Sequence, residues 1–267
     1  MAARLTHYAD TVDVAGVAFR VVCRYPKPRF WARSRPEFLT ARRPDVTVAI
    51  TYDEDFRRRA RRPAGEETVD DAPRVRRRGR GLLVTTGYYR AAVDVPRGRV
   101  AVRIAGGFGV ANLMRTLSAL WLLERDTLLL HATRLDRAGS VVVSGAGAEA
   151  SRTTTTSPAE VAGYVAVTPG TEGLTTRLTP FVDQGWPLPV SRRVHTTAFW
   201  ISRDDDEPAR ALGGAQALAT LLRAVWQADR RRAALARTLE LAARIVTAPE
   251  CRLVGAGVPR ADGSAVG

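Results

Sequence analysis

Apolar and polar residues alternate in short runs over the first hundred positions, which is the pattern of half-buried β-strands. Residues 11–24 alternate on both sides of Ala15-Gly16, so we predict a hairpin that turns at this pair. Further strands are predicted at 45–53, 82–88, 90–95 and 99–104. We therefore expect residues 1–105 to form an antiparallel, β-rich region.

Beyond residue 106 the pattern mixes helical and strand periods. Apolar residues recur at three- and four-residue steps over 108–125, which predicts a helix that is buried nearly all round at its end. Two more helices are predicted at 211–226 and 230–246, and the second is expected to be amphipathic through Leu235, Leu239, Ala242, Ile245 and Val246. Strands are predicted at 163–168, 174–178, 192–203 and 251–254.

This order of elements predicts an α/β (α+β) protein with a second domain over residues 106–254, in which helices cover a sheet. The final residues, 255–267, are expected to be a disordered tail.

A block of charge interrupts the first region. Residues 56–80 run from basic to acidic and back to basic, and they lack the apolar periodicity needed to bury a face. We predict an arginine-rich, solvated loop here. Docking of an anionic partner is the alternative, although the interleaved acids make the block a poor nucleic-acid arm.

Composition adds only a few constraints on the function and the location of the protein. The net charge is +14, and Lys27 is the only lysine among 41 basic residues, which is typical of a GC-rich genome as well as of polyanion binding. Cys23 and Cys251 have no metal or redox spacing, and we expect two buried or half-buried thiols. There is no apolar run long enough for a membrane span or a signal peptide, so we expect a cytoplasmic protein.

The stretch from Leu128 to Thr156, LLLHATRLDRAGSVVVSGAGAEASRTTTT, has the most distinctive layout in the chain. It predicts a short strand, a turn, a second strand and then a loop rich in glycine and alanine. A strand that leads into a glycine loop is the arrangement that holds phosphate in nucleotide-binding folds.

With the helix that ends in WLLER and the His131 strand, this stretch resembles the P-loop domain of HPr serine kinase, whose fold is shared with phosphoenolpyruvate carboxykinases. The segment Thr179-Pro180-Phe181 and the strand HTTAFWIS add to the resemblance, which covers residues 108–254. It implies an HPr kinase-like, P-loop-type domain that binds ATP and Mg²⁺ and phosphorylates a serine.

The loop departs from the phosphate-binding pattern G-x-x-x-x-G-K-S/T. Aligned on Gly145, the second glycine is replaced by Ala150, the lysine by Ser151 and the metal-binding hydroxyl by Arg152. Glu149 also lies inside the loop, where a carboxylate would repel phosphate.

A one-residue shift does not restore the motif, because Ser151 would then occupy the position of the second glycine. The vestigial nucleotide-binding residues are therefore Gly145, Gly147, Ser151, Arg152 and Thr153.

Other candidate residues add little chemistry. Family members carry an acid after the next strand, but here Glu160 precedes that strand and no acid follows before Glu172. His131 is either a phosphate contact or a strand histidine satisfied by a neighbour, and the second reading is favoured. The run Asp204–Glu207 lacks the spacing of a metal loop, so we predict a solvated turn and no metal site.

These observations favour a pseudoenzyme with no catalytic residues and no cofactor, which acts by binding another protein or a multi-protein assembly. The first alternative is an ATP- and Mg²⁺-dependent serine kinase with an atypical loop. The second is a binder of nucleic acid or another polyanion through an arginine-rich surface, which the sequence favours less than a protein partner.

Overall fold

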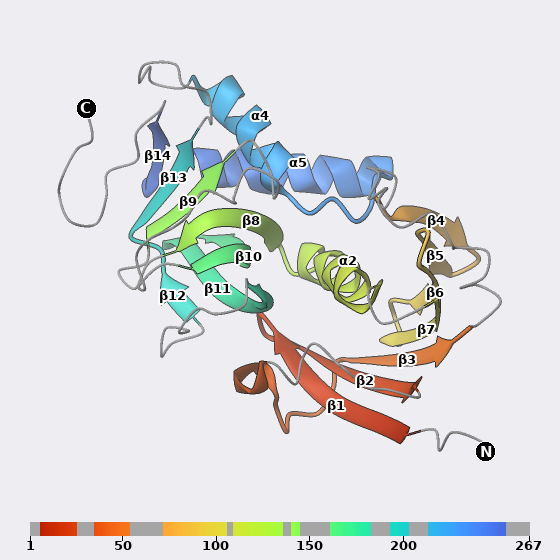
Figure 1. Ribbon diagram of the computed structural model, residues 1–267. Coiled ribbons are helices and arrows are strands. Elements are labelled where there is room, and N and C mark those ends of the chain that lie inside the picture. Colours follow the sequence, from red (N-terminus) through yellow and green to blue (C-terminus); the bar gives the residue numbers. More distant parts are fainter. Residues whose placement is uncertain are drawn as a thin grey trace, which may run out of the picture. The chain divides into compact units, whose positions relative to one another are not determined.

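The computed structural model describes residues 6–25, 35–53, 72–105, 109–135, 140–144, 161–182, 193–202 and 213–254 (Figure 1). Contacts divide the chain into two units. The first is Met1–Trp121 with Gln227–Ala234, and the second is Leu122–Trp226 with Leu235–Gly267. Both carry a sheet, and the described residues form a mixed fold of α-helices and mostly antiparallel β-strands, as predicted.

The first unit is built on a sheet whose described strands follow the order β1-β2-β3-β7-β6-β5-β4. Their bounds are β1 Thr6–Val14, β2 Val17–Tyr25, β3 Val46–Tyr52, β4 Arg74–Arg78, β5 Gly81–Thr85, β6 Tyr89–Asp94 and β7 Arg99–Ile104. The predicted strands are confirmed. The sheet is not wholly antiparallel, because β3 runs parallel to both β2 and β7.

The hairpin between β1 and β2 turns where the sequence predicts it. Ala15 and Gly16 both have positive φ, 53° and 93°, as in the two-residue turns that match the twist of the flanking strands. The Gly16 N–H also donates to Oδ1 of Asp13 at 2.9 Å. This local bond fixes the turn and with it the register of the first two strands.

The prediction of a loop over 56–80 is wrong at its end, where residues 74–78 form strand β4. This strand pairs antiparallel with β5 at the edge of the sheet, and four of its five side chains are exposed. An exposed edge strand needs no apolar alternation, and arginine is a common residue there because charge discourages further pairing. Residues 54–71 lie outside the described residues.

Helix α2 (Gly109–Leu123) covers the inner face of this sheet and confirms the predicted helix. Leu113, Met114 and Leu117 are fully buried, and Trp121 meets Phe19 of β2 edge-on at 6.0 Å between ring centroids. A short 3-10 helix, η2 (Pro36–Phe38), lies beside β1 and buries Phe38.

One polar contact ties α2 to the sheet. The buried hydroxyl of Tyr89 on β6 lies 3.0 Å from Oδ1 of Asn112 and 3.1 Å from Oγ1 of Thr116. Hydrogen bonds are directional, so this contact sets the position of the helix along the sheet in a way that apolar packing alone does not.

The second unit carries a sheet in the order β12-β11-β10-β8-β9-β13-β14. Its described strands are β8 Leu128–Leu135, β9 Ser140–Ser144, β10 Val161–Gly170, β11 Gly173–Val182, β12 Arg193–His195, β13 Ala198–Ser202 and β14 Cys251–Val254. From β12 to β9 the neighbours are antiparallel, whereas β9, β13 and β14 run parallel.

Two helices complete the described part of this unit: α4 (Gly214–Ala224), and α5 (Arg232–Val246), whose first three residues group with the first unit. Helix α4 packs against β8, β9 and β13. Both helices and strand β14 were predicted.

The structure corrects two details of the second unit. The single strand predicted at 192–203 is divided at Thr196 into β12 and β13, which pair with different parts of the sheet. On α5 the buried stripe is Thr238, Leu241, Ala242 and Ile245, which confirms Ala242 and Ile245 of the predicted face, whereas Leu235 and Leu239 are 42% and 48% exposed. Neighbouring apolar stripes have similar periodicity, so only packing decides which one is buried.

Among the described residues, no helix is long and apolar enough to cross a membrane. The predicted tail over 255–267 lies outside the described residues. The boundary predicted at residue 106 stays a prediction, and contacts group α2 with the first unit as far as Trp121.

We predict that Tyr89→Phe lowers the free energy of unfolding by roughly 1–2 kcal/mol, because the substitution leaves buried polar groups on α2 without their hydroxyl partner. The measurement is urea unfolding of Tyr89→Phe, Thr116→Val and the double variant. We expect the double variant to lose less stability than the sum of the single losses. Additive losses would show that the hydroxyl contact does not join helix and sheet.

Candidate functional site

The strand that leads to the glycine loop lies where the second sheet changes direction. Strand β9 is antiparallel to β8 on one side and parallel to β13 on the other. Ser144 at the end of β9 pairs with Ser202 at the end of β13, and Ser202 pairs with Val254 at the end of β14. The carboxyl ends of these strands therefore meet at one edge, which is where ligands bind in sheets with parallel strands.

The predicted nucleotide-binding residues come directly after β9 but lie outside the described residues. These are Gly145, Gly147, Ser151, Arg152 and Thr153. Their role in binding a nucleotide stays a prediction. The structure adds the position from which the loop departs, at the edge where the parallel strands end.

The topology changes the search for an acidic partner. The acid was expected near the next strand along the chain, which is β10, but β10 pairs with β8 and β11 and not with β9. The parallel neighbour of β9 is β13, and the acidic run Asp204–Glu207 follows β13 in the sequence. That run also lies outside the described residues. Only the strand order could reveal that this acidic run, rather than Glu160, follows the neighbouring strand.

His131 is the one predicted contact residue that the structure describes. It is 6% exposed on β8 and pairs across the sheet with Tyr164 of β10. The two rings meet edge-on at 5.1 Å, and Tyr164 in turn meets Trp226 at 5.5 Å and 88°. The backbone N–H of Trp226 donates to the backbone carbonyl of Leu129 at 2.8 Å, which fixes this aromatic cluster to β8. The arrangement favours a packing role for His131, and a phosphate contact stays a prediction.

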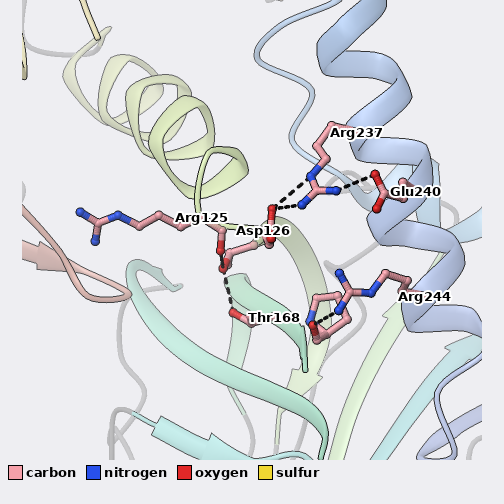
Figure 2. Close-up of polar contacts among 8 residues, drawn as sticks. Arg125, Asp126, Thr168, Arg237, Glu240 and Arg244 are labelled. Atoms are coloured by element: carbon pink, nitrogen blue, oxygen red, sulfur yellow. Dashed lines mark hydrogen bonds and ion pairs between the residues drawn. The ribbon is translucent and has the colours of Figure 1, made fainter. Parts of the chain in front are cut away.

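A second polar cluster has a structural role (Figure 2). Asp126, at φ 57° in the turn after α2, accepts hydrogen bonds from the guanidinium of Arg237 on α5, and the same guanidinium donates to Oε2 of Glu240 at 2.6 Å. These hydrogen bonds raise the pKa of Arg237. About two helical turns later, Arg244 donates to the carbonyl of Pro169 at 2.7 Å. These arginines join α5 to its own unit.

No group of metal-ligating side chains is found among the described residues. Cys23 is buried and Cys251 half-buried, and both are free thiols, as predicted. Burial raises the pKa of the Cys23 thiol, which keeps it protonated and unreactive at neutral pH.

The outer face of the first sheet carries a different kind of candidate site. The inner positions face α2, so the alternate positions of each strand face outward. The register places one outward residue from each neighbouring strand in a continuous row of small or apolar side chains. This alanine row consists of Ala9, Val22, Ala49, Ala101, Ala92 and Leu83.

Arginines lie in the rows on both sides of the alanine row. On one side, Arg103 of β7 is directly opposite Arg90 of β6, and Arg74 occupies the same row on β4. On the other side, Arg20 and Arg99 occupy one row with Thr47 between them, and Asp94 of β6 is directly opposite Arg99. Arg20, Arg74, Arg90, Arg99 and Arg103 are exposed. We call these two rows with the alanine row the arginine face.

The arginine face is not evident when charge is counted segment by segment along the sequence, because its arginines come from strands that are far apart in the chain. The signal was present: arginines stand two residues to either side of an apolar residue in RVVCR at 20–24 and in RVAVR at 99–103. Recognising it required knowing which strands are neighbours, since β3 lies between β2 and β7 although β7 follows it by more than forty positions.

The comparisons with known proteins give no family assignment. No protein-family model matches the sequence, and no curated protein matches it.

We predict that His131→Ala lowers the free energy of unfolding by about 2 kcal/mol, because it removes a buried ring from the cluster with Tyr164 and Trp226. His131→Phe keeps a ring in place and is expected to lose less than half as much. Thermal unfolding of the two variants measures the difference. An unchanged melting temperature in His131→Ala would refute the packing role.

Proposed function

We propose that this chain is a degenerate relative of HPr serine kinase and that it acts as a binding protein rather than as a kinase. The observation that carries the proposal is the content of the loop that follows β9. At the edge where three parallel strands end, the sequence provides Gly145 but has Ala150, Ser151 and Arg152 in the places of the second glycine, the lysine and the hydroxyl.

The physical reasoning is that phosphoryl transfer depends on positioning and on charge stabilisation at the terminal phosphates. A loop without the lysine provides no ammonium at that position, and Glu149 adds a negative charge beside the phosphates. The packing of His131 against Tyr164 supports the same interpretation, because it gives this histidine a structural use that needs no substrate.

A kinase-like fold that has lost its catalytic residues can still bind another protein or form part of a multi-protein assembly, and this is the role that we propose. A rigid sheet with a helix fixed across it by the Tyr89 hydroxyl provides a suitable platform. The exposed arginines of the first sheet supply charge for docking on such a platform.

A second candidate is an ATP- and Mg²⁺-dependent kinase with an atypical loop. One observation favours it: the acidic run Asp204–Glu207 follows β13, the parallel neighbour of β9. Carboxylates that follow the strand next to a phosphate loop are suited to hold Mg²⁺. In this reading Arg152 would supply the positive charge for the phosphates.

Calorimetric titration with ATP, with and without Mg²⁺, separates the two candidates. For the binding protein we expect no saturable heat up to millimolar ATP. Sub-millimolar binding that is lost in Arg152→Ala and weakened in Asp204→Asn/Asp206→Asn would replace the proposal with the kinase.

A restored loop tests the kinase-like ancestry separately. The triple variant Ala150→Gly/Ser151→Lys/Arg152→Thr rebuilds the pattern G-x-x-x-x-G-K-S/T on Gly145. We expect this variant to bind ATP with Mg²⁺ while the natural sequence does not, because the backbone at the end of β9 would again meet a lysine and a hydroxyl. The matched control is Ala150→Gly alone, which restores the glycine without the charge. A triple variant that folds and binds no ATP would argue against a P-loop-type domain.

A further inference from the structure

We propose that the arginine face of the first sheet docks an acidic amphipathic helix of a partner protein. This inference deepens the proposed binding role by naming a surface and the chemistry of its partner. It rests on the sheet register and on exposure, and it does not depend on the glycine loop.

Charge is the first step in the argument. Arg90 and Arg103 are directly opposite each other on neighbouring antiparallel strands, and like charges in that position destabilise a sheet. Asp53 lies 3.6 Å from Arg103, but it does not balance the rest of the row. Neither Arg20, Arg90 nor Arg99 has an ion-pair partner among the residues that the structure describes. An anionic partner would remove this repulsion and gain from the exposed guanidiniums.

The second step in the argument is the alanine row, because it restricts which kind of anionic partner fits the face. Ala49, Ala92 and Ala101 are exposed in the middle of the face, and Val22 and Leu83 are half-buried. A partner with an apolar stripe between two lines of negative charge matches the alanine row and the arginine rows on either side of it. A nucleic-acid duplex would place polar base edges and sugars over the alanines, and a single strand would find no Phe, Tyr or Trp in these rows on which to stack.

Dimensions are the third step. Rows two residues apart on a strand are separated by about 6.6 Å, so the two arginine rows are about 13 Å apart, close to the ~10–12 Å diameter of a helix with its side chains. The alanine row crosses from β1 to β5, five inter-strand steps of about 4.8 Å, or roughly 24 Å. A helix covers that distance in about 16 residues.

Twist favours a rigid rod over a flat partner. Successive strands of a twisted sheet rotate about the direction that crosses them, so a row across the strands stays straight while the strands turn. A helix that follows the alanine row keeps contact along its length, and the long arginine side chains follow its flanks as the sheet turns.

The experiment uses the full chain and a designed probe. The probe is an 18-residue helical peptide with leucines along one stripe and glutamates on both sides of it, labelled for fluorescence anisotropy. The comparison probes are a peptide of the same composition in scrambled order and an 18-base-pair DNA duplex. We expect the ordered peptide to bind at least about tenfold more tightly than the scrambled one, and to bind more weakly as salt rises.

Variants assign the binding to the face. Arg90→Gln/Arg103→Gln is expected to weaken peptide binding about tenfold, since each lost ion pair contributes modestly. Ala101→Gln is expected to weaken it as well, by placing an amide in the alanine row. Arg77→Gln is the matched control, because Arg77 lies on β4 opposite Leu82, on the other side of the sheet from Arg74 and the arginine face, and is also exposed. It is expected to bind the peptide as the natural sequence does.

Each other result overturns the inference in a defined way. Equal binding of ordered and scrambled peptides would show attraction by charge alone. Tighter binding of the duplex that Ala101→Gln leaves unchanged would assign the face to nucleic acid, and no binding of any probe would leave the arginines as a solvated surface. None of these results bears on the ATP titration, so the pseudoenzyme proposal is tested independently.

Discussion

The alternation of inward-facing and outward-facing side chains in the first sheet is the constraint on which most of the first unit depends. Phe19, Val48, Tyr89 and Val102 all face the side on which α2 packs. Because side chains alternate with a period of two, a slip of one residue on β7 would turn Arg103 into the core. The register is therefore fixed by apolar burial, and the arrangement of arginines on the outer face follows from it. The same packing that stabilises the sheet thus aligns the proposed docking surface.

The second unit depends on a change of strand direction. Antiparallel strands from β12 to β9 are held by local pairing and by the ring cluster of His131, Tyr164 and Trp226. Strand β9 then turns its other edge to the parallel strands β13 and β14. A chain leaving β9 emerges beside the ends of those strands, which is a suitable place for a phosphate loop. A site lost by side-chain replacement leaves this backbone arrangement intact, and this is why fold and activity can separate.

The described arginines fall into two groups that differ in whether their side chains are bonded within the molecule. Arg237 and Arg244 are bonded within the second unit and hold α5 to the turn after α2 and to the end of β10. Arg20, Arg90 and Arg99 are exposed on the first sheet and have no such partners there. Net charge alone does not distinguish these groups. Among the described arginines, those of the second group are the ones whose charge is available for the proposed docking.

The sequence by itself determined nearly all described helices and strands, because alternation at 11–24 and helical spacing at 108–125 arise from residues close in the chain. It also carries the prediction of an altered phosphate loop, since that motif is contiguous. The strand at 74–78, the division at Thr196 and the exposure of Leu235 and Leu239 were decided by tertiary structure. So were the neighbours of β9 and the rows of the arginine face. Each depends on which distant segments pair or pack, and local periodicity carries no information about pairing partners.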